Sequence, residues 1–361
     1  MSSADAPGMR GLREVLQERI ALEGPISVAD YMGTCLMHPE FGVYAARDPL
    51  GAAGDFTTAP EISQMFGELV GLALAHAWMD QGRPGAFTLA ELGPGRGTLM
   101  ADILRVGARV PGFVEAAHVV LVEVSPVLRA RQREALSGHS VTWIDRVEEL
   151  PQAPLWLVAN EFFDALPVRQ FQRSGAGWCE VRIGFDKGAL TRGLAGEAPV
   201  EALAHRLEDT RDGDIVEIAP ALPGIAAAVG QRIADHGGAG LVVDYGDWRS
   251  LGDTLQALER HERVDPLAGP GAADLTAHVD FEALASALPC AHTRLTPQGV
   301  FLERLGITAR AQQLAQGLSG ADLESHVAAH RRLTHPEEMG TVFKVLGLMP
   351  RAAPPVPGLE T

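Results

Sequence analysis

The stretch Glu91-Leu92-Gly93-Pro94-Gly95-Arg96-Gly97-Thr98 has the residue types and spacing of a ligand-binding turn. It follows an apolar segment typical of a strand and precedes a segment with helical spacing. Glycines in this context let the backbone turn tightly and approach a ligand without a Cβ clash. The dinucleotide pattern G-x-G-x-x-G needs glycine where this chain has Thr98, and the absence of a G-x-x-x-x-G-K-S/T motif excludes a P-loop. The pattern E-x-G-x-G-x-G therefore predicts a binding turn of another kind.

Two acidic residues, Glu91 and Glu123, accompany this turn. Glu123 ends the next strand, where nucleotide-binding folds place an acid that accepts hydrogen bonds from ribose hydroxyls. A carboxylate before the glycines disfavours a pyrophosphate and favours a ligand with positive charge at that point. S-adenosylmethionine carries such charge in its sulfonium and ammonium groups, so we predict it as the cofactor in place of NAD. The predicted binding residues are Glu91, Gly93, Gly95, Gly97, Thr98, Glu123, Asp145 (for the adenine amino group) and Asn160.

A second polar cluster, in the stretch Asn160-Glu161-Phe162-Phe163-Asp164-Ala165-Leu166-Pro167, follows the fourth strand of the same region. Ligands of open α/β sheets bind outside the carboxyl ends of the strands, so these groups should face the reacting centre. Glu161 and Asp164 are three residues apart and share one face of a helical turn. Carboxylates and amides of this kind orient an acceptor nitrogen, and we predict Asn160, Glu161 and Asp164 as catalytic residues. For Asp164, capping of a turn is the alternative.

Residues 54–64, which include Asp55, Thr58 and Glu61, offer many hydrogen-bonding groups beside an apolar helix. They are candidates to cap the cofactor site, although Thr58 and Pro60 also suit the start of a helix. Asp244-Tyr245-Gly246, at the end of a further strand, is another candidate lining segment.

Composition narrows the class of protein. The 361 residues include 30 Lys+Arg against 46 Asp+Glu, for a net charge of −16, which argues against nucleic acid and favours a basic or cationic partner. Cys35, Cys179 and Cys290 lie far apart and form no zinc or disulfide pattern. No H-E-x-x-H or G-x-S-x-G motif occurs, and His326 with His330 is typical of a solvated helix face, so we predict no metal.

The chain also shows no segment that predicts membrane insertion or export. The longest apolar run, from Leu69 to Met79, is too short to cross a bilayer. The N-terminus has no apolar signal core, and its arginines alternate with glutamates, unlike a transit peptide. We expect a cytoplasmic protein.

Hydrophobic spacing predicts the elements that position these residues. Helices are expected over 9–22, 30–37, 60–81, 98–106 and 126–136, and strands over 87–92, 119–124, 141–144, 155–159 and 241–244. This alternation is typical of an α/β fold with a parallel, doubly wound, Rossmann-like sheet. Residues 168–173 and 178–185 alternate like a hairpin. The expected division is a helical N-terminal cap (1–84), a cofactor-binding core (85–165 and 214–250), an inserted cover (166–213), a C-terminal α+β part (251–349) and a flexible tail (350–361).

Four motifs together resemble the MidA family of class I S-adenosylmethionine-dependent methyltransferases, which is related to a mitochondrial assembly factor of respiratory complex I. They are the stretches 55–64, 91–98, 160–167 and 275–281, and the resemblance runs from about residue 10 to 349. It implies symmetric dimethylation of an arginine in a protein such as a complex I subunit. It also implies that Gly93, Gly95 and Gly97 hold the methionine moiety and Glu123 the ribose, while Asn160 and Glu161 face the acceptor. The lack of a transit peptide suggests a bacterial relative.

The predicted reaction is in-line transfer of the sulfonium methyl group to a guanidinium nitrogen. Glu161 would bind the guanidinium through two hydrogen bonds and leave one nitrogen free to attack. Asp164 or Asp55 would accept the released proton. Three alternatives stay open: a small-molecule methyltransferase, an assembly chaperone with a vestigial cofactor site, and an NAD enzyme, which Thr98 and Glu91 disfavour.

Overall fold

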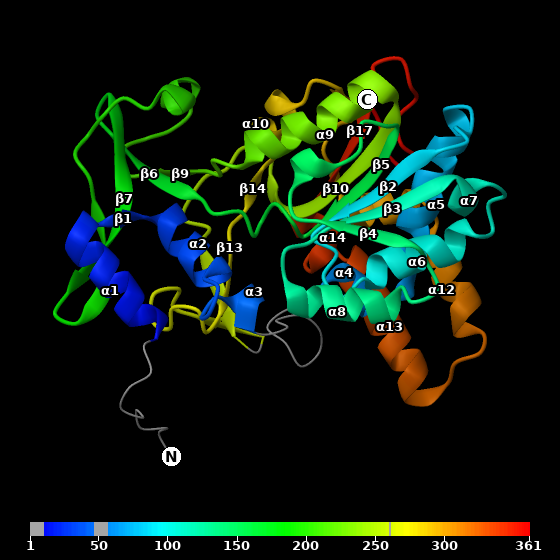
Figure 1. Cartoon of the computed structure of the whole chain (residues 1–361), viewed down its shortest axis with the longest axis horizontal. Coiled ribbons are helices and arrows are strands. Elements are labelled where there is room, and N and C mark those ends of the chain that lie inside the picture. The colour runs from blue at the N-terminus through cyan, green and yellow to red at the C-terminus, as the bar shows by residue number, and fades with distance from the viewer. Residues whose placement is uncertain (1–10, 47–56, 260) are drawn as a thin grey trace. The chain divides into compact units, whose positions relative to one another are not determined.

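The computed structural model describes residues 11–46, 57–259 and 261–361 and divides the chain into two compact units. The first unit comprises residues 1–49, 166–220 and 251–277. The second unit comprises residues 50–165, 221–250 and 278–361, and it contains all the predicted site residues. Figure 1 shows the whole chain coloured from the N-terminus to the C-terminus.

The second unit is built on one mixed sheet with the strand order β15-β17-β10-β5-β2-β3-β4. Strands β4, β3, β2, β5 and β10 pair in parallel, and β17 pairs with β10 in antiparallel fashion. Two short strands join this sheet, β14 beside β10 and β16 beside β17. The strands are β2 (Phe87–Leu92), β3 (Ala117–Val122), β4 (Val141–Ile144), β5 (Leu155–Asn160), β10 (Gly238–Asp247), β14 (Val279–Asp280), β15 (Ala291–His292), β16 (Thr296–Pro297) and β17 (Phe343–Met349).

Helices cover both faces of this sheet, as the continuous apolar strands require. The helices are α4 (Ala59–Ile62), α5 (Gln64–Asp80), α6 (Thr98–Gly107), α7 (Phe113–Ala116), α8 (Pro126–Ala135), the 3₁₀ turn η1 (Val147–Glu149), α9 (Leu222–His236), α10 (Phe281–Ala287), α11 (Gln298–Arg304), α12 (Ile307–Ala315), α13 (Gly320–Thr334) and α14 (Met339–Val342). Alternate strand residues, such as Leu89, Val158 and Leu241, pack in one apolar core with α5 and α6. Helices α9 and α10 lie against the other face (Figure 1).

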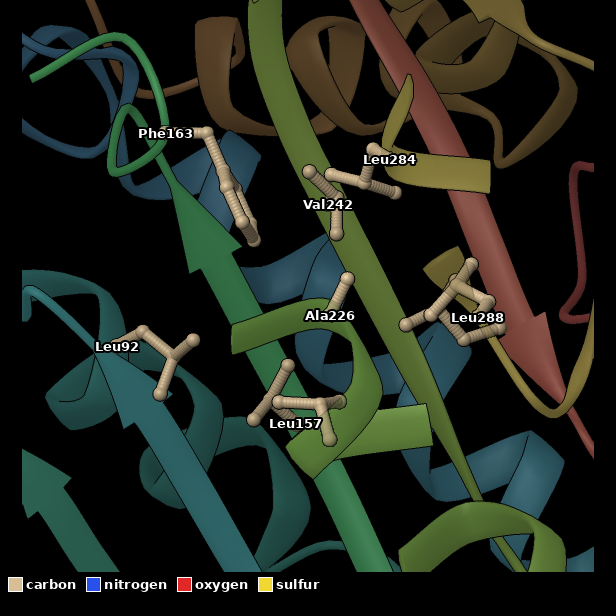
Figure 2. A pocket seen from close by; sticks show the side chains of 9 residues that line it. Leu92, Leu157, Phe163, Ala226, Val242, Leu284 and Leu288 are labelled. Atoms are coloured by element: carbon tan, nitrogen blue, oxygen red, sulfur yellow. The ribbon is translucent and has the colours of Figure 1, made fainter. Parts of the chain in front are cut away.

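A small cavity lies between the sheet and the α9–α10 layer (Figure 2). Its lining residues are Leu92, Leu157, Phe163, Ala226, Val229, Val242, Leu284, Leu288 and Leu348. All nine side chains are apolar, so the cavity offers no group that would bind a charged or polar ligand. It marks imperfect packing of the core on this face.

A buried ion network joins α5, α6 and α12 on the opposite face. Glu68, which is 3% exposed, accepts hydrogen bonds from Arg310 (Nε to Oε2, 2.7 Å) and Arg105 (Nη1 to Oε1, 2.8 Å). Burial alone would raise the pKa of Glu68, but the two arginines lower it overall. Arg105 also pairs with Asp102, one helical turn earlier on α6. The network fixes α6, which begins directly after the glycine turn, against its neighbours.

Gly67 permits the close contact between α5 and α6. A Cβ atom at Gly67 would lie 2.6 Å from the Cβ of Asp102, which is too close for any residue but glycine. We therefore expect Gly67→Ala to lower the free energy of unfolding by roughly 2 kcal/mol through overpacking. Gly224 on α9 is the matched control, since a Cβ there meets nothing within 4 Å. Gly224→Ala should stabilise by about 0.5 kcal/mol through helix propensity alone. Urea unfolding of both variants checks the prediction, and equal effects would contradict it.

The first unit is built on a separate antiparallel sheet in the order β1-β7-β6-β9, with β8 beside β7, and on the three-stranded sheet β12-β11-β13. Its core contains the buried side chains of Leu16, Tyr31, Met32, Val168 and Ile183. The elements are α1 (Leu12–Glu23), β1 (Ile26–Ser27), α2 (Val28–Met37), α3 (Val43–Ala46), β6 (Arg169–Ser174), β7 (Gly177–Asp186), β8 (Ala189–Leu194), the 3₁₀ helix η2 (Glu201–Leu207), β9 (Ile215–Ile218), β11 (Gln256–Glu259), β12 (Glu262–Val264) and β13 (Asp274–Thr276).

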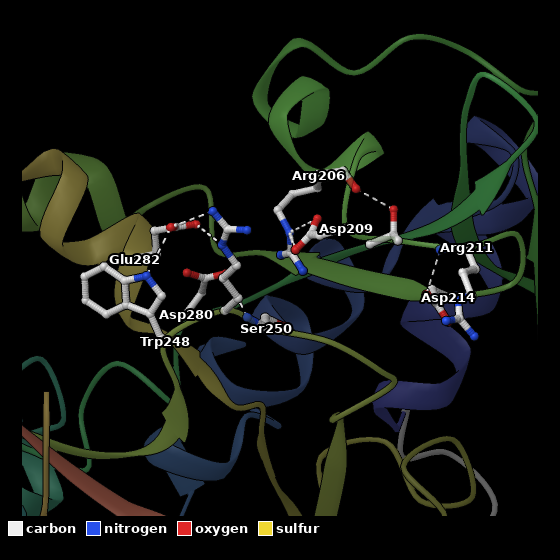
Figure 3. Close-up of polar contacts among 10 residues, drawn as sticks. Arg206, Asp209, Arg211, Asp214, Trp248, Ser250, Asp280 and Glu282 are labelled. Carbon is white, nitrogen blue, oxygen red and sulfur yellow. Dashed lines mark hydrogen bonds and ion pairs between the residues drawn. The ribbon is translucent and has the colours of Figure 1, made fainter.

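Local polar contacts stabilise the loops of each unit (Figure 3). In the second unit, the guanidinium of Arg249 pairs with Glu282 at 2.7 Å, and the backbone N–H of Ser250 donates to Asp280. In the first unit, Arg206 pairs with Asp209 at 3.0 Å next to η2. These bonds fix the loops after β10 and η2 without contributing to the predicted site.

The α/β class and the parallel order of the core strands agree with the sequence analysis. The observed grouping of segments differs from the expected division at several boundaries. Residues up to 49 group with 166–220 and 251–277 because β1 pairs with β7 and β9 pairs with β6. Helix α5 groups with the sheet of the second unit, onto which it packs. The tail, expected to be flexible, instead buries Val356 and Leu359 in the core, because apolar side chains there outweigh its prolines.

Candidate active site

The predicted site lies where the strand order reverses. From β2 the chain continues to β3 and then β4 on one side, while β5, on the other side of β2, leads on to β10 and β17. Open α/β sheets bind ligands at such a switch point, outside the carboxyl ends of the strands. The register pairs Leu92 with Ala159, so the glycine turn after β2 and Asn160 of β5 lie side by side.

The glycine turn has the backbone that only glycine adopts easily. Gly93, Gly95 and Gly97 have φ values of +61°, +53° and +85°, in the left-handed region. A Cβ atom at Gly93 would lie 2.9 Å from the Phe162 ring, so the turn also touches the segment after β5. Two bonds hold the turn, from Gly93 N–H to the Val122 carbonyl at 3.0 Å and from Gly97 N–H to the Pro94 carbonyl at 2.8 Å. These hydrogen bonds therefore fix the backbone conformation of the turn.

Glu91 is a buried carboxylate with an unused oxygen. It is 3% exposed, and its Oε2 atom has no hydrogen-bond partner among the described residues. Burial raises its pKa to about 8, a bond from the Met100 backbone lowers the value, and the neighbouring charge of Glu123 raises it further. A buried unpaired acceptor is costly, so its presence points to a ligand that supplies a donor or a cation.

Glu123 sits one residue past β3 and is also buried. Its Oε1 atom accepts from the Ser125 backbone at 2.8 Å, and its Oε2 accepts from the Gln132 side chain at 3.2 Å. Burial raises its pKa, and these two bonds lower it in part. A carboxylate has about four lone-pair positions, so capacity remains for ribose hydroxyls.

Gln132 on α8 is a site residue that the sequence analysis missed. It is fully buried and donates from Nε2 both to the Gly95 carbonyl at 2.7 Å and to Glu123. Its Oε1 atom accepts from the Trp143 ring at 2.8 Å. It therefore ties the glycine turn, β3 and β4 together. The only sequence signal is its place four residues after buried Leu128, on the inner face of a helix.

Thr98 and Asp145 lie on the same side of the sheet end but already have protein partners. Thr98, the first residue of α6, donates its hydroxyl to Glu61. Asp145 is exposed after β4 and pairs with Arg129 at 2.6 Å. Arg129 also donates to the Glu123 carbonyl at 2.7 Å, so it links the two strand ends. The proposed roles of both residues in cofactor binding stay predictions.

Asn160 ends β5, Glu161 follows it, and the two side chains form one polar pair. Glu161 has φ of +52°, which is unusual for a residue with a side chain, and its N–H donates to the Val243 carbonyl at 2.9 Å. Its Oε1 accepts from the Ala59 backbone at 2.9 Å and from Asn160 Nδ2 at 3.1 Å. Burial raises the Glu161 pKa to about 7, and those two bonds lower it in part. The Asn160 Oδ1 atom is buried without a partner among the described residues.

Asp244 of β10 fixes the segment after Glu161. Its Oδ2 atom accepts from three successive backbone N–H groups, at Phe162 (3.2 Å), Phe163 (2.9 Å) and Asp164 (3.3 Å). Burial and the nearby charge of Glu161 raise its pKa to about 8. Asp164 itself is buried, and its carboxylate lies in the segment that Asp244 holds. Asp55, the other candidate proton acceptor, lies outside the described residues.

We expect Asp244→Ala to lower the free energy of unfolding by about 2 kcal/mol, because it removes the acceptor of three backbone N–H groups, two of them at the buried residues Phe163 and Asp164. Asp244→Asn keeps one oxygen that can turn toward those groups, so its loss should be smaller. Chemical unfolding of the two variants checks this. If the alanine variant is as stable as the asparagine variant, Asp244 does not hold the segment.

A family model described as "Putative S-adenosyl-L-methionine-dependent methyltransferase" matches residues 69–300. The chain belongs to this methyltransferase family. The mitochondrial protein arginine methyltransferase NDUFAF7 of Danio rerio is 36% identical over 92% of this chain and 86% of its own. The human protein of the same name is 36% identical over 97% of this chain and 86% of its own. A Burkholderia thailandensis protein solved with S-adenosyl-homocysteine is 30% identical, covers 99% of this chain and 97% of its own, and has a TM-score of 0.83.

The predictions of a methyltransferase and of S-adenosylmethionine as its cofactor are confirmed by these matches. The residues present fit that cofactor on structural grounds. The unpaired Glu91 oxygen suits a cation, and the three glycines of the turn, all at positive φ, expose backbone that no Cβ atom covers. The geometry thus brings together Glu91, the glycine turn, Glu123 and the Asn160–Glu161 pair.

Two features are absent from residues 11–46, 57–259 and 261–361. In that part of the chain, no helix has the length and apolarity needed to cross a membrane. Nor does any group of three His, Cys, Asp or Glu residues in these ranges have the geometry to hold a metal ion.

Proposed function

We propose that this methyltransferase transfers methyl groups from S-adenosylmethionine to an arginine guanidinium in a protein substrate, with Glu161 as the residue that binds the guanidinium. The observation that carries the proposal is the Glu161 carboxylate. Its Oε1 is held by Ala59 and Asn160, while none of the described residues donates to its Oε2. The names of the relatives, protein arginine methyltransferases, support an arginine acceptor.

The chemistry of Glu161 suits a guanidinium better than a neutral acceptor. Arginine stays protonated at all relevant pH values and presents parallel N–H donors that match a carboxylate. When bound, S-adenosylmethionine supplies an activated methyl group, so the protein's task is alignment and exclusion of water. Two guanidinium nitrogens that both donate to Oε2 of Glu161 would hold the positive charge on their side and leave the third nitrogen to attack.

The partly buried setting of Glu161 strengthens this interaction. The electrostatic attraction between two charges is stronger away from water than on the surface. The hydrogen bonds from Ala59 and Asn160 hold the carboxylate in place before the acceptor binds. Asn160 contributes a second acceptor, its unpaired Oδ1, for a substrate N–H group. Asp164 is the proposed proton acceptor among the described residues. Symmetric dimethylation and a respiratory complex I subunit as substrate belong to the same proposal, and a bacterial cytoplasmic location stays a prediction.

The test is transfer of isotopically labelled methyl groups from S-adenosylmethionine into a bacterial lysate. After separation by size, the protein fraction is hydrolysed and its methylated amino acids are identified by mass spectrometry. We expect the label on protein arginine, as symmetric dimethylarginine. Label that appears only in the small-molecule fraction would instead establish a small-molecule methyltransferase. Cofactor binding with no transfer to any fraction would support the chaperone alternative.

A further inference from the structure

One short helix, α4, contacts both Glu161 and the segment of the glycine turn and the start of α6. The backbone N–H of Ala59 donates to Glu161 Oε1 at 2.9 Å. Two residues later, the Oε1 atom of Glu61 accepts a hydrogen bond from the Thr98 hydroxyl. The Oε2 atom of Glu61 lies 3.9 Å from Arg96 Nη1. Arg96 belongs to the glycine turn, and Thr98 is the first residue of α6. The helix therefore connects the cofactor turn with the residue proposed to bind the acceptor.

The helix is rigid enough to transmit position between these two contacts. Pro60 restricts one of its φ angles, and both Ala59 and Pro60 are buried. The Thr58 carbonyl accepts from Glu61 N–H at 2.9 Å and from Ile62 N–H at 3.2 Å. At the other end, Ser63 is extended and its hydroxyl caps α5 by accepting from the Met65 N–H. Ala59 and Glu61 thus lie in one fixed turn.

Glu161 depends on such support. A residue with a side chain at φ of +52° is strained, and it holds that conformation only when its surroundings enforce it. The Val243 carbonyl holds its backbone, while Ala59 and Asn160 hold its carboxylate. Displacement of α4 would remove the Ala59 bond and release the side chain.

We propose that α4 couples the cofactor turn to Glu161, with Glu61 as the positioning residue. Through Thr98 and Arg96, Glu61 fixes the turn that binds the cofactor, and through Ala59 the same helix aims Glu161. The effect of Glu61 on the cofactor turn requires only that the protein binds S-adenosylmethionine. The effect of Glu61 on Glu161 rests on the proposed function, in which Glu161 binds the acceptor. The alternative is that Glu61 serves only as a surface carboxylate near a helix start.

The first test measures the affinity of purified full-length variants for S-adenosyl-homocysteine by calorimetry. We expect Thr98→Val and Glu61→Gln each to raise the dissociation constant about tenfold, the effect of one lost charge-assisted hydrogen bond. Thr98→Ser keeps the hydroxyl that Glu61 accepts from, so it should bind at least about fivefold more tightly than Thr98→Val. Exposed Glu115, changed to Gln, controls for loss of charge. A valine variant that binds normally, or a serine variant as weak as valine, would overturn the proposal.

The second test asks whether Glu61 acts through Glu161. Glu61→Gln is combined with Glu161→Gln, and labelled methyl incorporation into lysate protein is measured at saturating S-adenosylmethionine. In the wild-type background Glu61→Gln should slow incorporation, but with Glu161 already replaced it should cause little further loss, since nothing is left to aim. Equal fold losses in both backgrounds would refute the coupling. If Glu161→Gln alone were fully active, the proposed function would fail, whereas the affinity test of Glu61 would still stand.

Discussion

Glu91→Gln is expected to weaken S-adenosylmethionine binding by about a hundredfold, the effect of breaking a buried charge pair worth roughly 3 kcal/mol, while it stabilises the cofactor-free protein. The wild-type carboxylate is buried, and one of its oxygens has no partner among the described residues. Glutamine has nearly the same shape but no charge to desolvate. Loss of affinity together with a gain of stability is the signature of a group retained for a ligand.

The stability gain should depend on pH with a defined sign. Burial raises the pKa of Glu91 from 4.5 to about 8, so the folded protein binds more protons than the unfolded chain between these values. Wild-type stability therefore falls as pH rises through this window, whereas the glutamine variant lacks this contribution. The difference in free energy of unfolding should grow from pH 5 to pH 8 and then level off. Urea titrations at several pH values, with Glu115→Gln as control, measure it, and a pH-independent difference would contradict the burial argument.

Glu161→Gln is expected to lower the methylation rate by about a hundredfold, the magnitude typical of removing one preorganised electrostatic contact at a reacting centre. Cofactor affinity should stay within about twofold, since in the proposed function Glu161 binds the acceptor and not the cofactor. Calorimetry with S-adenosyl-homocysteine and labelled methyl transfer into lysate protein separate the two effects. Equal losses of affinity and rate would show that Glu161 supports the fold of the site instead.

The pH profile provides an independent check of the same residue. Glu161 must be ionised to bind a guanidinium, and burial raises its pKa to about 7. The rate of methyl transfer at low acceptor concentration depends on the ionisation of groups in the acceptor-free enzyme. This rate should therefore increase as the pH rises through about 7. Glu161→Gln should lose this increase, while Glu161→Asp should keep it at a reduced rate. A wild-type profile that is flat between pH 6 and 8 would argue against an ionised Glu161 as the guanidinium ligand.

The sequence predicted the elements of the core with good accuracy because the strands are buried on both faces. The segments 87–92 and 141–144 match β2 and β4 at both ends. The strand expected over 119–124 lies at 117–122, since the apolar run continues past the last paired residue into the turn that Glu123 and Ser125 form. The helix expected over 30–37 begins two residues earlier, at Val28, because the Ser27 hydroxyl accepts from the Asp30 N–H and caps it.

The polar residues at strand ends were also found from sequence, because topology alone brings the ends of β2, β3 and β5 together. Contacts between distant segments were not predictable in this way. The bond between Ala59 and Glu161 joins positions 102 residues apart, and Gln132 gives no polar signal that separates it from an exposed glutamine. The buried tail was missed because proline content describes local stiffness and says nothing of apolar contacts such as those of Val356 and Leu359.

The central claim is that the buried Glu91 carboxylate binds the cationic group of the cofactor. The most direct test is the number of protons that the protein releases when the cofactor product binds. At pH 7 a carboxyl group with a pKa of about 8 is mostly protonated, and it must ionise to meet the ammonium group of S-adenosyl-homocysteine. Calorimetry in buffers of different ionisation enthalpy should show release of close to one proton by the wild type, about 0.9 from this pKa, and none by Glu91→Gln. Equal proton release by both proteins, or none by the wild type, would contradict the account.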